Sequence, residues 1–151
     1  MSPDFTDVVI GEGPDEVFIF NIRINPLRRC EFLSIIEHGI KNRRQIAQFG
    51  VNSATINDIV RNDGFRVTIN NADLVHIDGM SVVWALRSFG YEVPERVATP
   101  DLADDILEMA NREGMSIFLF GAQENILSLC RENIEKKFPS IVISGSRNGY
   151  Y

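Results

Sequence analysis

Residues 66–96, RVTINNADLVHIDGMSVVWALRSFGYEVPER, are the part of the chain that most clearly determines its fold. The β-branched residues 67–69 and the mostly apolar residues 74–77 predict two short strands, separated by a polar turn. Asp78 and Gly79 then predict a second turn. A helix capped by Ser81, with one apolar face, follows and ends at Gly90. This order places a carboxylate in a glycine-flanked turn between a strand and a helix.

Asp78 has two interpretations at this point. Its apolar neighbours would restrict water around the carboxylate and raise its pKa, which suits a general base. Asp-Gly is also a common turn pair, so the residue can instead be a turn former with no chemical role. The residues alone favour this second interpretation, but both stay open.

Strands and helices alternate along the rest of the chain. Further strands are predicted at residues 17–20, 22–24, 45–51, 115–120 and 141–143, with an edge strand at 8–10. Further helices are predicted at residues 27–41, 53–62, 99–113 and 124–137. The alternation predicts an α/β domain over residues 17–151, with a largely parallel, Rossmann-like sheet and flanking helices, after a loose lead-in at 1–16. The apolar run 115–120 predicts a strand that is covered on both faces.

Three residues directly follow predicted strands: Asn52, Asp78 and Gly121. Parallel sheets bind ligands beyond the carboxyl ends of their strands, so we expect these residues to share one crevice. Residues 120–121 give a strand-glycine-helix pattern like half of a nucleotide-binding unit, but no GxGxxG is present.

Composition excludes several classes of protein. A net charge of -6 argues against nucleic-acid binding through a general basic surface. Cys30 and Cys130 lie in apolar helical patterns and predict buried free thiols rather than a disulfide, and no cysteine-histidine cluster suggests zinc. His38 and His76 are isolated, which favours surface or internally satisfied histidines. No apolar run is long enough for a bilayer and the N-terminus lacks a signal-peptide pattern, so we expect a cytoplasmic protein.

Several linked motifs carry a resemblance to a known family. They are Asn71-Ala72-Asp73, Asp78-Gly79-Met80, residues 82–87, Pro94-Glu95-Arg96-Val97, Pro100-Asp101-Leu102, residues 117–121 and Gly149-Tyr150-Tyr151. In this order and spacing they resemble the WecG/TagA/CpsF glycosyltransferase family from about residue 18 onward. The resemblance implies a hexosyltransferase that moves N-acetylmannosamine or a similar sugar from a UDP-sugar to a polyprenyl-diphosphate-linked sugar. It implies action at the inner face of the bacterial membrane, in cell-surface polysaccharide synthesis. It also implies inversion at the anomeric centre without a metal ion or other cofactor.

The resemblance assigns three roles near the central stretch. Asp78 becomes the general base, Arg96 the partner of the leaving diphosphate, and Asn52 a residue that positions a sugar or the acceptor. A guanidinium offers a rigid fork of donors to phosphate oxygens. The alternatives are a salt bridge from Arg96 to Glu95 or Asp101, and a helix cap for Asn52.

Three more residues are candidate substrate contacts. Asn71 can line the same crevice or form an Asx-turn, and the second role is favoured. By the resemblance, Gly121 and Tyr150 are expected near the substrate, with Tyr150 approaching the nucleotide.

The sequence also departs from the family pattern. Gly50 stands where the family commonly has threonine, and Thr99 stands where it usually has glycine. The chain ends at Tyr151, without the family's Pro-Lys-Gln-Glu motif and basic C-terminal segment. We therefore expect a C-terminally truncated fold that self-associates as a homo-oligomer. A truncated, non-catalytic nucleotide-sugar-binding or regulatory module, or a Rossmann-like domain with unrelated ligands, are the alternative functions.

Overall fold

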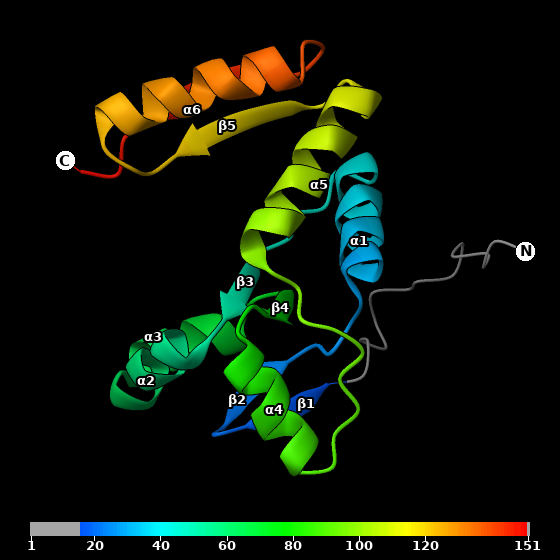
Figure 1. Ribbon diagram of the computed structural model, residues 1–151, viewed down its shortest axis with the longest axis vertical. Coiled ribbons are helices and arrows are strands. Elements are labelled where there is room, and N and C mark those ends of the chain that lie inside the picture. The colour runs from blue at the N-terminus through cyan, green and yellow to red at the C-terminus, as the bar shows by residue number, and fades with distance from the viewer. Residues whose placement is uncertain (1–15, 151) are drawn as a thin grey trace, which may run out of the picture. The chain divides into compact units, whose positions relative to one another are not determined.

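The computed structural model describes residues 16–150, and contacts group the chain into two compact units, Met1–Leu102 and Ala103–Tyr151 (Figure 1). The edge strand expected at 8–10 and nearly all of the expected lead-in lie outside the described residues. The expected α/β class is confirmed. In place of one sheet, the described residues form three two-stranded sheets, two of them parallel.

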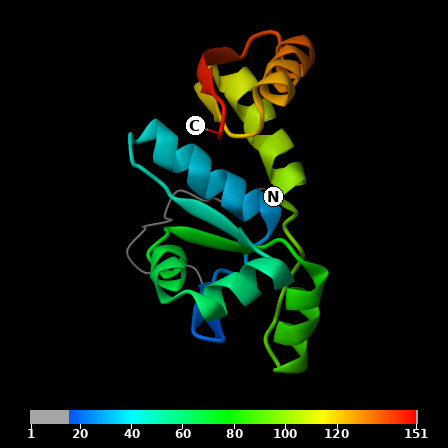
Figure 2. The ribbon, with the colours of Figure 1, turned by 90° about the vertical axis from the view of Figure 1, so that its left-hand side faces the viewer.

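The first unit supplies most of the elements. They are β1 (Val17–Ile19), β2 (Ile22–Ile24), α1 (Arg29–Lys41), β3 (Gln48–Val51), α2 (Ser53–Arg61), α3 (Asp63–Asn70), β4 (Leu74–Ile77) and α4 (Met80–Ser88). β1 and β2 form an antiparallel hairpin, whereas β3 and β4 run parallel, with Val51 opposite Ile77. Figure 2 shows α1 on one side of the β3–β4 pair and α2 with α3 on the other. The short strands are therefore covered on both faces.

The strand expected at residues 67–69 is wrong, because these residues belong to α3. The side chain of Asn62 caps this helix by accepting a hydrogen bond from the backbone N–H of Phe65 at 3.1 Å. Of the β-branched run, Ile69 is fully buried while Val67 is 55% exposed, as the period of a helix requires. A local cap and one buried anchor thus outweigh the β-propensity of the triplet.

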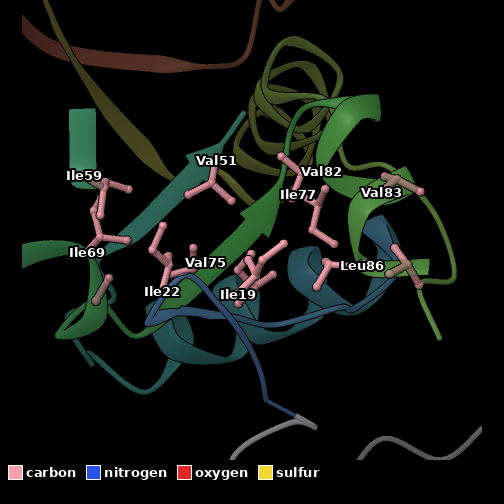
Figure 3. Packing of buried hydrophobic residues seen from close by; sticks show 13 residues of the cluster. Ile19, Ile22, Val51, Ile59, Ile69, Val75, Ile77, Val82, Val83 and Leu86 are labelled. Carbon is pink, nitrogen blue, oxygen red and sulfur yellow. The ribbon is translucent and has the colours of Figure 1, made fainter. Parts of the chain in front are cut away.

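The core of the first unit fixes β4 in place. Every residue of β4 is buried, and its neighbours in the cluster come from β1, β2, β3, α2, α3 and α4 (Figure 3). The cluster includes Ile19, Ile22, Val51, Ile59, Ile69, Val75, Ile77, Val82, Val83 and Leu86. Burying one such side chain stabilises a fold by about 1.5–3 kcal/mol. The carboxyl end of β4, where Asp78 follows, is therefore a rigid position.

The second unit contains a β-α-β arrangement. Its elements are β5 (Ser116–Phe120), α6 (Glu124–Lys137) and β6 (Val142–Arg147), preceded by α5 (Thr99–Glu113), which begins at the end of the first unit. β5 and β6 are parallel, with an irregular register between Ile117 and Phe118. These bounds lie close to the predicted ones.

Several burial predictions for this part are wrong. Phe118 and Phe120 on β5 are 59% and 63% exposed, so the strand is not covered on both faces. On α6, Leu127 and Ile134 are buried, whereas Ile126 and Leu129 are exposed. Cys130 is exposed as well, although it was predicted to be buried. The buried stripe of α6 has a seven-residue spacing and is narrower than its apolar composition suggests.

The cysteines are free, as predicted, but Cys30 and Cys130 are exposed rather than buried. Cys30 lies on α1, whose buried residues are Phe32, Ile35, Ile36 and Gly39. The two isolated histidines fulfil the expectation for them, with His38 at the surface and His76 fully buried and hydrogen-bonded.

Candidate active site

The turn after β4 lies against the end of β3. The backbone N–H groups of Asp78 and Gly79 both donate to the carbonyl oxygen of Val51, at 2.9 and 3.3 Å. Since β3 and β4 are parallel, Asn52 and Asp78 emerge at the same edge of the pair. The expected meeting of these two residues is therefore observed.

Asn52 has two roles at once. Its side-chain oxygen caps α2 by accepting from the backbone N–H groups of Ala54 and Thr55, at 3.0 and 3.1 Å. Its side-chain nitrogen donates to Oδ2 of Asp78 at 3.3 Å. A side chain added at Gly79 would place Cβ 2.9 Å from the Cβ of Asn52, so glycine permits this approach.

The other oxygen of Asp78 is held from the start of α5. The backbone N–H of Val97 donates to the carbonyl oxygen of Ile77 at 2.9 Å, which brings this segment beside the end of β4. Two residues later, the backbone N–H of Thr99 donates to Oδ1 of Asp78 at 2.8 Å. The carboxylate is thus oriented by donors from two segments that are distant in sequence.

The pKa of Asp78 corrects one expectation. Partial burial raises it, as the apolar neighbours suggest. The Thr99 backbone N–H, the Asn52 amide, nearby His76 and the Thr99 side chain together lower the pKa more, to below its ordinary 3.8. The predicted rise is therefore wrong. The carboxylate is ionised at neutral pH and can accept a proton, although a lower pKa makes it a weaker base.

His76 lies behind this carboxylate. It is fully buried, its Nε2 is 3.0 Å from the hydroxyl oxygen of Thr99, its Nδ1 contacts the Gln48 amide nitrogen, and the Phe32 ring meets it edge-on. Burial lowers the pKa of His76, although Asp78 and a hydrogen bond with the Phe49 backbone raise it. The ring is therefore neutral at pH 7. Sequence reasoning gave His76 no role in the site, yet its position near the end of β4, two residues before Asp78, was a usable signal.

Arg96 presents an exposed side chain. Both carboxylates proposed as its salt-bridge partners contact Arg29 instead. Glu95 accepts from the backbone N–H of Arg29 at 2.6 Å, and Asp101 pairs with the Arg29 guanidinium at 3.5 Å. Within residues 16–150 the Arg96 guanidinium has no ion pair or hydrogen bond, so it is available to an external anion.

Asn71 is not brought to Asp78. It ends α3, where its backbone N–H donates to the carbonyl oxygen of Val67 at 3.0 Å, and its side chain is exposed. Because β4 follows Asn71 and precedes Asp78, the two residues lie at opposite ends of that strand.

Gly121 and Tyr150 belong to the second unit. Gly121 has φ +132° and donates its backbone N–H to the carbonyl oxygen of Arg147 at 3.0 Å. Gly149 donates to the carbonyl oxygen of Ala122 at 3.0 Å, which places the exposed Tyr150 at the same end of the β5–β6 pair as Gly121. The two residues therefore share one edge of their own unit.

The part of the chain that the structure describes contains no group of three or more His, Cys, Asp or Glu side chains arranged to hold a metal ion. Within the same residues, no helix has the length and apolar character needed to cross a membrane.

Comparison with known proteins agrees with the motifs around this site. The glycosyl transferase WecG/TagA/CpsF family matches the sequence over residues 17–151. The chain belongs to this family. One relative is the N-acetylglucosaminyldiphosphoundecaprenol N-acetyl-beta-D-mannosaminyltransferase of Bacillus spizizenii, 27% identical over 93 residues. The match covers 62% of this chain and 36% of the relative, so the chain matches about a third of that protein's length.

Proposed function

We propose that this family member takes part in sugar transfer for bacterial cell-surface polysaccharide synthesis. The donor is a UDP-sugar carrying N-acetylmannosamine or a similar sugar, and the acceptor is a polyprenyl-diphosphate-linked sugar. The observation that carries the proposal is the ionised Asp78 carboxylate. It is fixed by Thr99 and Asn52 at the carboxyl end of a parallel strand pair, where α/β folds bind ligands.

The proposed reaction is a single displacement. Asp78 accepts the proton of the acceptor hydroxyl as its oxygen forms a bond to the anomeric carbon of the donor sugar. The bond between that carbon and the diphosphate oxygen breaks on the opposite face, UDP leaves with the electron pair, and the configuration inverts. A general base of this kind contributes roughly 10²–10⁴-fold to the rate.

Arg96 is the proposed partner of the leaving diphosphate. Its exposed guanidinium forms no ion pair with the described residues, and its fork of donors fits phosphate oxygens. It would balance the charge that develops on the leaving group without a metal ion. For the second unit, Gly121 and Tyr150 are proposed nucleotide contacts, supported by their shared edge.

Exposed apolar side chains support self-association. Trp84 and Phe89 on the first unit are each 65% exposed, and Phe118 and Phe120 on the second are similarly exposed. Surfaces of this kind are commonly buried in protein or membrane contacts. A homo-oligomer that works in the cytoplasm, at the inner face of the plasma membrane, is the proposed state.

The deciding experiment measures donor-dependent transfer to a lipid-linked sugar acceptor. The parent chain is compared with Asp78→Asn and with Asp58→Asn, which alters an exposed aspartate on α2. Transfer by the parent and the Asp58 variant, with strong loss in the Asp78 variant, is the expected result. Equal transfer by the parent and the Asp78 variant would reduce Asp78 to a turn residue.

A second candidate is a non-catalytic nucleotide-sugar-binding or regulatory module. The observation that favours it is the engagement of both Asp78 oxygens by protein donors, which lowers the pKa and weakens the base. Calorimetry combined with the transfer assay separates the two candidates. A non-catalytic module would bind a UDP-sugar in the calorimeter but would show no sugar transfer.

A further inference from the structure

Thr99 connects the proposed base with the buried histidine. Its backbone N–H donates to Oδ1 of Asp78 at 2.8 Å, and its hydroxyl oxygen is 3.0 Å from Nε2 of His76. The Thr99 side chain also forms a hydrogen bond to the Asp78 carboxyl group. One residue therefore holds the carboxylate through both its backbone and its side chain.

Hydrogen-bond donors can be assigned from their chemistry along the series of contacts from Gln48 through His76 and Thr99 to Asp78. The amide of Gln48 turns its nitrogen to Nδ1 of His76, and an amide nitrogen can only donate. In a neutral ring Nδ1 then accepts and the ring proton is on Nε2, where the Thr99 hydroxyl oxygen and the Phe49 backbone carbonyl share it as acceptors. The hydroxyl hydrogen is left to point at Asp78, whose ionised oxygens only accept.

Gly50 provides the space for this arrangement. A Cβ at position 50 would lie 2.6 Å from Nε2 of His76 and 2.7 Å from the hydroxyl oxygen of Thr99. The hydroxyl of Thr99 therefore occupies the space that a side chain on β3 would need.

We propose that Thr99 is a positioning residue for Asp78, that buried His76 directs its hydroxyl toward the carboxylate, and that Gly50 makes room for the pair. The hydroxyl at this edge of the strands comes from Thr99, the first residue of α5. This inference rests on the proposed function for its catalytic consequence, but its structural content can be tested without any transfer.

The first test follows the carboxyl carbon of Asp78 by ¹³C NMR during a pH titration. Thr99→Val keeps the backbone N–H and the shape but removes a donor to the charged form, so the pKa of Asp78 should rise. Thr99→Ser retains the hydroxyl and should keep the pKa of Asp78 close to that in the parent chain. Thr68→Val is the matched control, because the Thr68 hydroxyl donates to the backbone carbonyl oxygen of Gly64 at an exposed position on α3. An unchanged titration of Asp78 in Thr99→Val would overturn the inference.

The second test uses the parent chain and so does not depend on any variant folding. The ¹⁵N shifts of the His76 ring should show a neutral ring with its proton on Nε2 at pH 7. A proton on Nδ1 would mean that His76 accepts from Thr99, and the proposed direction of the hydroxyl would be wrong.

Transfer kinetics test the catalytic consequence. In Thr99→Val, kcat should fall roughly tenfold, the scale of one hydrogen bond to a charged group. The acidic limb of the kcat/KM profile should move to higher pH together with the Asp78 titration, while KM for the donor changes little. If transfer continues in Thr99→Val and the acidic limb of the kcat/KM profile does not move, the positioning role of Thr99 is rejected and the proposed function is unaffected. A parent without transfer, but with the expected NMR shifts, rejects the proposed function and retains the positioning role.

Discussion

Two strand-turn-helix segments of this protein have nearly the same backbone plan but different chemistry. In the first, β4 leads through Asp78 and Gly79 into α4. In the second, β5 leads through Gly121 and Ala122 toward α6. Both strands belong to parallel pairs. The first turn carries an ionised carboxylate, whereas the second is defined by positive φ values of 132° and 59° and by backbone hydrogen bonds with the last residue of β6 and with Gly149 beyond it.

The difference shows what a strand-glycine-helix signature can and cannot indicate. It fixes the path of the backbone in both places, but the candidate site depends on groups that converge from elsewhere. Around Asp78 these are the side chain of Asn52, which caps α2, and the backbone N–H of Thr99, the first residue of α5. At Gly121 the described contacts are backbone groups of residues 147–149. The two turns should therefore respond to mutation in different ways.

Asp78→Asn should have the largest effect. The amide keeps the shape of the side chain but cannot accept the proton, so transfer should fall by about 10²–10⁴-fold. Donor binding, measured by calorimetry, should be nearly unchanged. Gly121→Ala tests the other turn: it adds a Cβ at a backbone angle that favours glycine, and it should alter binding more than the chemical step. If Asp78→Asn mainly weakened donor binding and Gly121→Ala mainly slowed transfer, the roles assigned to the two turns would be wrong.

Arg96→Ala should have the next largest effect. Losing a charge-assisted bond to the diphosphate should weaken UDP-sugar binding by roughly 1.5–3 kcal/mol, and turnover should also fall. UDP-sugar binding should be measured in the presence of EDTA, where the parent chain should bind as tightly as it does with added magnesium. Arg131→Ala removes an exposed arginine that pairs with Glu135 on α6 and is the control. Binding that requires a divalent ion would assign the diphosphate to a metal.

How much of the site could be predicted depends on how far apart its residues lie in the sequence. The strand, turn and helix around Asp78, and the meeting of Asn52 with Asp78, follow from short patterns and from parallel strand geometry. The sign of the Asp78 pKa shift was missed because the decisive donor, the Thr99 backbone N–H, lies 21 residues away. Apolar neighbours in sequence indicate burial, but they do not reveal which donors fold back onto a buried group.

The fold was predictable in the same uneven way. Long periodic helices such as α1 and α6 were located within a few residues, since their apolar spacing is strong. The short β-branched segment 67–69 was assigned to a strand because the Asn62 cap five residues earlier was overlooked. The exposure of Phe118 and Phe120 could not be inferred, because an apolar run does not say how many faces of its strand are covered.

A double mutant tests whether positions 50 and 99 share one space. Gly50→Thr should destabilise the fold by about 1–3 kcal/mol, because its side chain would overlap His76 and Thr99. Adding Thr99→Gly removes one of the two clashes. The double variant should therefore lose less stability than the sum of the single variants, with a coupling of about 0.5–3 kcal/mol in urea unfolding. Simple additivity would show that the two positions do not compete.

The smallest expected effect is a pH dependence of stability that arises from His76. Its pKa is lowered in the folded state from the ordinary 6.5, mainly by burial, and Asp78 is the charged group that opposes this shift. Below about pH 6.5 the unfolded chain therefore binds a proton that the folded chain does not. Above that pH, His76 is neutral in both the folded and the unfolded chain, so its ionisation does not change the free energy of unfolding. As the pH falls from 6.5 toward the folded pKa, the unfolding free energy should decline by at most about 1.4 kcal/mol per pH unit. The lowered pKa of Asp78 affects stability in a separate pH range, because its stabilising contribution is lost only as the pH falls below 3.8.

Urea unfolding of the parent and of His76→Gln between pH 5 and pH 8 isolates the contribution of the histidine. The stability of the parent relative to the variant should decrease toward pH 5, and His38→Gln, an exposed site on α1, should retain the slope of the parent. A difference between the parent and His76→Gln that does not change with pH would mean that His76 gains its proton as readily in the folded chain as in the unfolded one, and the neutral ring assigned to the site next to Asp78 would have to be abandoned.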